Sequence, residues 1–162
     1  MTARTVIHET FAIERIYTAT PSRVFAAFAS AEAKNVWGDT GDLEPAGGSA
    51  STAEFDFRPG GRERFGFKWS GKTYRYDALY YDIVPDQRIV YSYEMYMNEA
   101  RISVSVATIE FAKSSNGTAL TWTEQGAYLD GFDGLEAPAL RKQGTTEMLD
   151  NLPGYLASQA AD

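Results

Sequence analysis

The feature that most constrains the fold is a run of six alternating segments joined by short links. Apolar and polar side chains alternate, with the period of a β-strand, over residues 53–58, 62–69, 73–84, 88–97, 102–112 and 118–127. The links hold turn-forming residues, and in the last of them Asn116-Gly117 predicts a primed hairpin turn. Because a parallel crossover needs a dozen residues or more, links this short can join only antiparallel neighbours. The sequence therefore predicts an antiparallel meander.

Helical patterns and one more strand precede this meander. An alternating stretch at 11–18 predicts a first strand. Thr20 followed by Pro21 predicts the cap and first position of a short helix, and 31–37 has the pattern of a second one. Residues 38–51, rich in glycine and acidic side chains, are expected to form a loop.

A long amphipathic helix is predicted at 138–160. Its apolar stripe consists of Leu140, Met148, Leu149, Leu152 and Leu156. The side chains expected to face away from the sheet are Arg141, Lys142, Glu147 and Asp150. Pro153 lacks an amide donor and is expected to kink the helix near Leu152. This helix is the only long element that can cover the sheet, so we predict one α+β domain over residues 1–162, a curved antiparallel sheet wrapped on a C-terminal helix.

Charge and composition argue against several classes of function. The 162 residues carry a formal charge of −7, and Arg62, Arg64 and Lys68 are expected to be kept apart by the strand pleat, so nucleic-acid binding is disfavoured. There is no secretory signal, no apolar run of membrane-spanning length and no cysteine, which predicts a cytoplasmic protein without membrane contact. His8, the only histidine, is expected before the first strand. Since a zinc site usually needs at least two His or Cys ligands, no metal or other cofactor is predicted.

One stretch has the spacing of a phosphate-binding loop but the wrong neighbours. Residues 66–73 satisfy the pattern G-x-x-x-x-G-K-[ST], which binds phosphate when a glycine-rich loop opens a helix. Here the intervening residues are bulky and alternate, and the residues that follow alternate as well. We therefore predict a hairpin turn at Ser70-Gly71-Lys72 rather than a nucleotide site.

Several motifs, taken in order, resemble one known family. They are the stretches 55–61, 82–90, 108–111, 117–121 and 123–126, together with 21–25 and Trp37. Their order and spacing resemble those of the activator of Hsp-90 ATPase homologue family, in the START-like, polyketide-cyclase-like (SRPBCC) superfamily. The resemblance implies the helix-grip fold. It does not imply one function, because relatives bind lipids, steroids, hormones or polyketides, some catalyse cyclisation, and the eukaryotic namesake stimulates a chaperone.

The aromatic content predicts a ligand cavity between the sheet and the C-terminal helix. Ten Tyr, nine Phe and three Trp supply large apolar faces with a few polar tips, the composition of a ligand pocket. The expected lining is Trp37 at the mouth, with Phe65, Phe67, Trp69, Tyr91, Tyr93, Met95, Trp122, Gly144 and Met148. Gly144 interrupts the apolar stripe and has two interpretations. Either a bulky strand residue packs closely against it, which is favoured, or it leaves room for a ligand.

Glu124 is the one candidate for catalysis. It shares a strand face with Leu120 and Trp122, so we expect it to point inward near the mouth. A carboxylate among aromatic rings has a raised pKa and can act as an acid or base. The favoured alternative is a rim carboxylate paired with an arginine or a tyrosine hydroxyl, with a pKa of about 4.3, that of a model glutamate.

Three functions follow from these patterns. The favoured one is non-enzymatic binding of an apolar or aromatic small molecule. The first alternative is an enzyme of cyclase or hydrolase type that uses Glu124 with tyrosine hydroxyls. The second is a chaperone-interaction module, similar to a co-chaperone.

Overall fold

The order of elements places one long helix after a nearly continuous sheet. A computed structural model describes residues 3–38, 44–45 and 52–159. Its elements are β1 (Val6–Tyr17), α1 (Pro21–Phe28), α2 (Ala31–Trp37), β2 (Glu44–Pro45), β3 (Thr52–Phe55), β4 (Arg62–Trp69), β5 (Lys72–Val84), β6 (Arg88–Met97), β7 (Ala100–Ser114), β8 (Gly117–Leu129) and α3 (Ala137–Gln159). None of the helices in this part of the chain is long and apolar enough to cross a membrane. The expected loop at 38–51 lies mostly outside the described residues.

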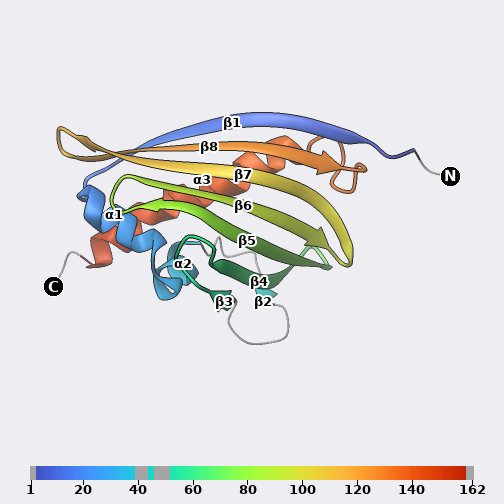
Figure 1. Ribbon diagram of the computed structural model, residues 1–162, viewed down its shortest axis with the longest axis horizontal. Coiled ribbons are helices and arrows are strands. Elements are labelled where there is room, and N and C mark those ends of the chain that lie inside the picture. The colour runs from blue at the N-terminus through green and yellow to red at the C-terminus, as the bar shows by residue number, and fades with distance from the viewer. Residues whose placement is uncertain (1–2, 39–43, 46–51, 160–162) are drawn as a thin grey trace.

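The sheet is an antiparallel meander, as predicted. Its order is β1-β8-β7-β6-β5-β4-β2, and β3 also pairs with β4. From the end of β8 the chain turns, and α3 runs back across one face of the curved sheet toward α1 (Figure 1). We call the face toward α3 the inner face. The α+β class and the helix-grip arrangement, with two short helices after the first strand, are confirmed.

The link between β4 and β5 confirms that residues 66–73 are strand and turn. Trp69 pairs with Lys72, which leaves Ser70 and Gly71 as a two-residue turn. Both turn residues have positive φ angles, 52° for Ser70 and 77° for Gly71. Such a pair is typical of a primed hairpin turn, which matches the twist of the flanking strands. No helix begins here, so the chain does not build a phosphate-binding loop at this position.

The primed turn predicted at Asn116-Gly117 is wrong. Ser114 pairs with Gly117, so the two turn residues are Ser115 and Asn116, and neither has a positive φ. Gly117 is required for a different reason, because a Cβ at this position would lie 2.1 Å from the carbonyl oxygen of Tyr17. The hairpin therefore depends on close approach of another backbone rather than on a left-handed glycine.

One expectation about a polar residue is also wrong. His8 does not precede the first strand, because β1 starts at Val6 and His8 is an exposed residue within it.

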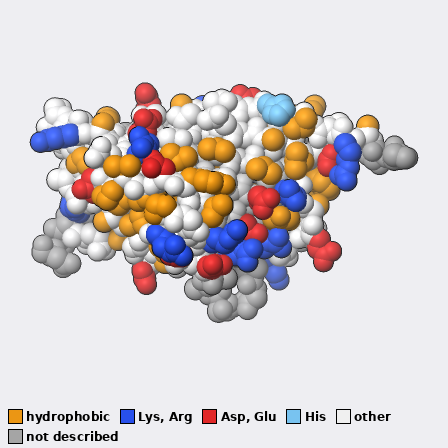
Figure 2. Space-filling view, in the orientation of Figure 1, with side chains coloured by type: hydrophobic (Ala, Val, Ile, Leu, Met, Phe, Trp, Pro, Cys, Tyr) orange, Lys and Arg blue, Asp and Glu red, His pale blue; other side chains and the backbone are white. Residues whose placement is uncertain are grey.

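Basic residues of β4 and β5 lie beside acidic ones. Arg64 of β4 and Arg75 of β5 both form ion pairs with Asp77, at 3.4 and 3.2 Å. Figure 2 shows Lys and Arg side chains gathered with acidic ones over this edge of the sheet.

The apolar stripe of α3 is buried toward its C-terminal end. Leu149, Leu152 and Leu156 are buried as predicted, and Lys142, Glu147 and Asp150 are exposed as predicted. Leu140 is the exception, since 46% of its surface remains exposed. The helix continues past Pro153 to Gln159, and the kink near Leu152 stays a prediction.

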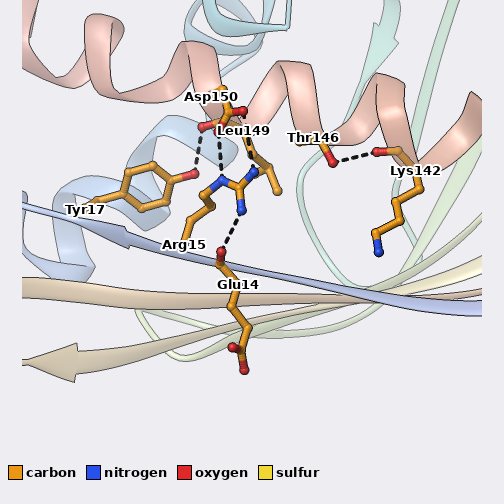
Figure 3. Close-up of polar contacts among 7 residues, drawn as sticks. All are labelled: Glu14, Arg15, Tyr17, Lys142, Thr146, Leu149 and Asp150. Atoms are coloured by element: carbon orange, nitrogen blue, oxygen red, sulfur yellow. Dashed lines mark hydrogen bonds and ion pairs between the residues drawn. The ribbon is translucent and has the colours of Figure 1, made fainter.

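Strand β1 ties the C-terminal half of α3 to the sheet. The Tyr17 hydroxyl donates to the Leu149 carbonyl at 2.9 Å, and the Arg15 guanidinium pairs with Asp150 at 2.7 Å (Figure 3). Burial raises the pKa of Tyr17, so its hydroxyl remains a donor. One hydrogen bond and one ion pair thus attach the same turn of α3 to β1.

Candidate ligand-binding site

Glu124 lies on the inner face of the sheet with its side chain completely buried. Its exposed fraction is 0%. The carboxylate accepts hydrogen bonds from the Tyr93 hydroxyl at 2.7 Å and from the Trp122 indole N–H at 3.3 Å. Burial raises the pKa of the Glu124 carboxyl, while Arg141 and the two hydrogen bonds act in the opposite direction.

The inward orientation of Glu124 is confirmed, but the expected position at the rim is wrong. It is paired with a tyrosine hydroxyl, as the favoured interpretation required. However, β1 starts at Val6 and pairs along the whole of β8, so Glu124 has a strand on each side and Phe11 opposite it. Deep burial follows, and the pKa of the carboxyl rises instead of staying at its ordinary value.

Arg141 is the largest departure from the sequence-based expectation, because it reaches from α3 to the sheet. Its guanidinium donates to the Tyr93 hydroxyl at 3.0 Å and to Ser103 Oγ at 2.8 Å. It also lies over the rings of Tyr93 and Tyr128, 5.4 and 5.3 Å from their centres. Burial disfavours the charged guanidinium, but the nearby oxygens of Tyr93, Glu124 and Tyr128 outweigh burial and raise the pKa of Arg141. The side chain is therefore a fixed cation on the inner face.

The sequence does carry a signal for the orientation of Arg141. Positions 141, 145, 149, 152 and 156 are separated by four, four, three and four residues, which is the spacing of one helix face. Thr145 and the three leucines at these positions are buried. Because it is charged, Arg141 was expected to face the solvent. Its spacing from the buried residues of α3 instead predicts that it faces the sheet.

Two hydroxyls complete this group of polar side chains. Ser105 Oγ and the Tyr128 hydroxyl are buried, and among the described residues neither has a hydrogen-bond partner. Both lie close to Gly126, where a Cβ would be 3.0 Å from Ser105 Oγ and 3.2 Å from the Tyr128 hydroxyl. Burial raises the pKa of Tyr128 to about 12, so the hydroxyl stays protonated at neutral pH. Buried hydroxyls without partners are uncommon. These two can therefore still form hydrogen bonds to another molecule.

We call this group the polar cluster. Its members are Tyr93, Ser103, Ser105, Glu124, Tyr128 and Arg141. Three strands and α3 contribute to it, and each strand contributes side chains from its inward-facing positions. Sequence reasoning identified Tyr93 and Glu124. It missed the others because serine and tyrosine on an inward position are read as core until the register between strands is known.

An aromatic row leads from the polar cluster toward the β4 edge. The Tyr76 ring lies 5.0 Å from the Tyr93 ring on one side and stacks on Phe65 at 4.7 Å on the other. Strand pairing places Phe65, Tyr76 and Met95 directly across from one another. All three are only half-buried, although they lie on the inner face. The inner face is thus less fully covered here than beneath the C-terminal half of α3.

Gly144 and Met148 lie on the same side of α3 as Arg141, and both are half-buried. A Cβ at Gly144 would meet no heavy atom of the described residues within 4 Å. The favoured interpretation of Gly144, close packing against a bulky strand residue, is therefore wrong. Its replacement by a larger residue is sterically allowed, so the glycine leaves open space at this point of the helix.

The remaining candidates lie in different places. Trp37 is 3% exposed, packs on Phe28 and donates its indole N–H to the Ala27 carbonyl at 2.9 Å, so it belongs to the core and not to a mouth. Tyr91 and Trp122 are likewise buried core residues whose rings meet edge to face at 6.2 Å.

Two further candidates lie toward the β4–β5 turn. Phe67 stacks on Tyr74 at 5.2 Å, in a smaller cluster with Met97. Trp69 is 42% exposed next to the turn. The Tyr76 ring thus links Phe65 to Tyr93, with Met95 across from Tyr76. Gly144 and Met148 belong to α3, the helix that carries Arg141, and Trp69 lies apart from this group.

An open hollow of about 450 Å³ lies at the end of the sheet where β8 stops. Its lining residues are Arg4, Ala100, Arg101, Leu129, Asp130 and Phe132. A smaller hollow beside it, about 10 Å³, is lined in part by Tyr128 and Ala137. The smaller hollow therefore borders the polar cluster from the side of the β8–α3 link.

Solved structures of related proteins have the same fold. An uncharacterized protein from Rhizobium leguminosarum is 40% identical, with a TM-score of 0.84 over 97% of this chain and 99% of that one. The Mll3558 protein from Rhizobium loti is 44% identical, with a TM-score of 0.80 over 93% of this chain and 99% of that one. Protein CV1439 from Chromobacterium violaceum, at 24% identity and a TM-score of 0.74 over 91% and 96% of the two chains, is similar in fold alone.

The family comparison agrees with these structures. No functionally curated protein matches the chain. Residues 18–157 match the family described as Activator of Hsp90 ATPase homolog 1-like protein, so the match covers both short helices, β2 to β8 and most of α3. The chain therefore belongs to the Activator of Hsp90 ATPase homolog 1-like family, within the START-like (SRPBCC) superfamily.

Proposed function

We propose that this protein binds an apolar or aromatic small molecule between the inner face of the sheet and the N-terminal half of α3. The observation that carries the proposal is the open space beside Gly144 on a helix that covers half-buried aromatic side chains. Ligand binding is common in this superfamily, which supports the same assignment. Ligand sites are mostly apolar with a few placed polar groups, and this region offers both.

The aromatic row supplies the apolar contact. Stacked rings such as Phe65 and Tyr76 present a flat surface on which a ring of a ligand can lie. Met148 of α3 is half-buried against the main core cluster, and its unbranched thioether side chain adapts to ligands of different outline. The polar cluster lies at one end of this surface and would fix the orientation of the ligand.

Glu124 is less suited to acid–base catalysis than to holding Tyr93. Its raised pKa is a property that general acids share. Yet its side chain is completely buried and already accepts two hydrogen bonds, from Tyr93 and Trp122. A substrate atom would have to reach a carboxylate that has no exposed surface. We therefore assign Glu124 to positioning the Tyr93 hydroxyl within the site.

A fluorescent apolar probe tests the proposal. N-phenyl-1-naphthylamine is neutral and emits strongly only in apolar surroundings, and we expect it to bind at micromolar concentration. Methyl-labelled methionine reports the location by NMR. The signal of Met148 should shift on titration, and it should shift more than that of Met97, which packs with Tyr74 in the smaller cluster. Absence of a fluorescence increase, or binding that leaves the Met148 signal unchanged, would contradict the proposed site.

A further inference from the structure

We propose that the ligand of this site carries an anionic group at one end, of carboxylate or sulfonate type, and that Arg141, Ser105 and Tyr128 bind it. The inference rests on the proposed function, because it names the chemistry of the molecule held at that same site. It follows from the hydrogen-bonding capacity that the polar cluster leaves unused.

Arg141 is a cation without an ion-pair partner. Among the described residues, no carboxylate oxygen lies within 4.0 Å of its guanidinium, whose recorded partners are the neutral hydroxyls of Tyr93 and Ser103. A guanidinium has five N–H donors, so several remain available. Its planar fork matches the two oxygens of a carboxylate or sulfonate. Glu124 acts on this guanidinium only across the Tyr93 hydroxyl. A half-buried arginine without a carboxylate in direct contact is therefore suited to an anion supplied by a ligand.

Two further donors lie beside the guanidinium. Ser105 is two residues from Ser103 on β7 and points to the same face, and the Tyr128 ring lies 5.3 Å from the Arg141 guanidinium. Only 1% of Ser105 and 5% of Tyr128 is exposed, and their hydroxyls have no partner among the described residues. Donors from β7, β8 and α3 thus converge. A group with two or three acceptor oxygens can engage all of them, whereas one carbonyl oxygen cannot.

The two buried carboxylates of the inner face, in contrast, already have donors. Glu124 accepts from Tyr93 and Trp122. Glu63, the other buried glutamate, accepts from Lys34 and from Tyr80, each at 2.6 Å. Glu63 is also paired with the cation of Lys34, whereas the Arg141 guanidinium keeps N–H donors with no carboxylate in direct contact. This difference in charge favours an anion over an organic cation.

The direction of α3 places the apolar part of the ligand. Gly144 and Met148 follow Arg141 by three and seven residues, so the three positions lie on one side of the helix. With a rise of 1.5 Å per residue, the distance along the axis from Arg141 to Met148 is about 10 Å. An anionic group at Arg141 would leave an apolar body of that length beside Gly144. Two or three aromatic rings have this size.

A matched pair of probes tests the inference. 8-Anilinonaphthalene-1-sulfonate has the ring system of N-phenyl-1-naphthylamine plus one sulfonate. We expect the sulfonate probe to bind at least about tenfold more tightly than the neutral probe, the scale of one charge-assisted hydrogen bond. Arg141→Gln should abolish this advantage, so that the two probes bind the variant with affinities within about twofold of each other. Lys142→Gln is the control, because it removes the same charge from the exposed neighbouring position.

The outcomes separate the inference from the proposed function. If both probes bind the unchanged protein equally, the anion site is contradicted while the apolar site stands, and this comparison needs no variant. Equal weakening of both probes by Arg141→Gln, or the same loss of sulfonate binding in Lys142→Gln, would also overturn the inference. If neither probe binds, the proposed function fails and the inference fails with it.

Discussion

The two halves of α3 lie on the same sheet but contact it in different ways. In the C-terminal half, Leu149 and Leu152 are 0% exposed, and Tyr17 and Arg15 bond the adjacent turn to β1 (Figure 3). In the N-terminal half, the sheet is reached by the charged side chain of Arg141, and Gly144 leaves open space. One half is an apolar interface, and the other meets the sheet through a charged side chain near a glycine without close neighbours.

The two halves of α3 are therefore expected to have different roles, the C-terminal half in stability and the N-terminal half in binding. Apolar burial contributes about 25 cal/mol per Å² without requiring a particular direction, so the leucines hold α3 against the sheet by themselves. The N-terminal half is then free to carry open space and unused donors, which a fully packed interface could not tolerate.

Truncating a leucine of the C-terminal half should have the largest effect. Leu152→Ala is expected to lower the free energy of unfolding by about 2–5 kcal/mol. Leu152 is fully buried, so the substitution removes apolar contacts and leaves a cavity in the core. Met148→Ala should cost clearly less, since Met148 is half-buried beside open space. Urea unfolding followed by tryptophan fluorescence measures both. Equal losses would show that the two halves are packed alike.

Filling the N-terminal half should impair binding and not folding. Gly144→Leu places a side chain in the open space, and we expect at least about a tenfold loss of affinity for N-phenyl-1-naphthylamine, or about 1.4 kcal/mol. The free energy of unfolding should rise or stay constant, because glycine is about 1 kcal/mol less favourable than alanine in a helix. Gly154→Leu is the matched control. A Cβ there also meets nothing within 4 Å, but the position lies in the C-terminal half, so binding should persist. Unchanged affinity in Gly144→Leu would place the ligand elsewhere.

The smallest effect concerns the pH dependence of stability at Glu124. Because burial raises the pKa of this carboxyl in the folded protein, the folded state holds its proton at pH values where the unfolded chain has released it. The stability that follows is present below the unfolded pKa of about 4.3 and is lost as the pH rises through the folded pKa. Glu124→Gln lacks this dependence. Its stability relative to the unchanged protein should therefore increase as the pH is raised.

Urea unfolding at several pH values between 4 and 8 measures this trend. Near pH 4 the variant should match the unchanged protein within about 1 kcal/mol, since glutamine has the shape of a protonated glutamate. The groups that face Glu124 are Tyr93, Trp122 and Arg141, and they remain in place in the variant. Glu14→Gln, at an exposed position of β1, controls for the loss of one charge. A constant difference across the pH range would contradict the raised pKa.

Much of the fold could be predicted, because it depends on patterns within a few residues. Alternation located β4 and β6 at their observed bounds, and the spacing of Leu149, Leu152 and Leu156 identified the buried stripe of α3. The site was predicted in part. Gly144 was identified as an interruption of the stripe, and Glu124 was assigned to the correct face.

The errors share one cause. Trp37 was expected at a mouth, Glu124 at a rim and Arg141 in solvent, and each depends on which distant segment covers the residue. The hydrophobic period of a strand or helix predicts the side to which a residue points. It does not predict how deeply that side is buried.

The antiparallel meander, the long C-terminal helix and the aromatic inner face follow from local sequence patterns, because turn chemistry and side-chain period are local properties. The contacts of Arg141 with Tyr93 and Ser103, residues 48 and 38 positions away in the chain, arise only in the folded protein. The same holds for the absence of close neighbours around Gly144. Contacts of this kind depend on the register between strands and on where α3 crosses the sheet. Both are determined by the burial of apolar surface in the whole core and not by any local segment.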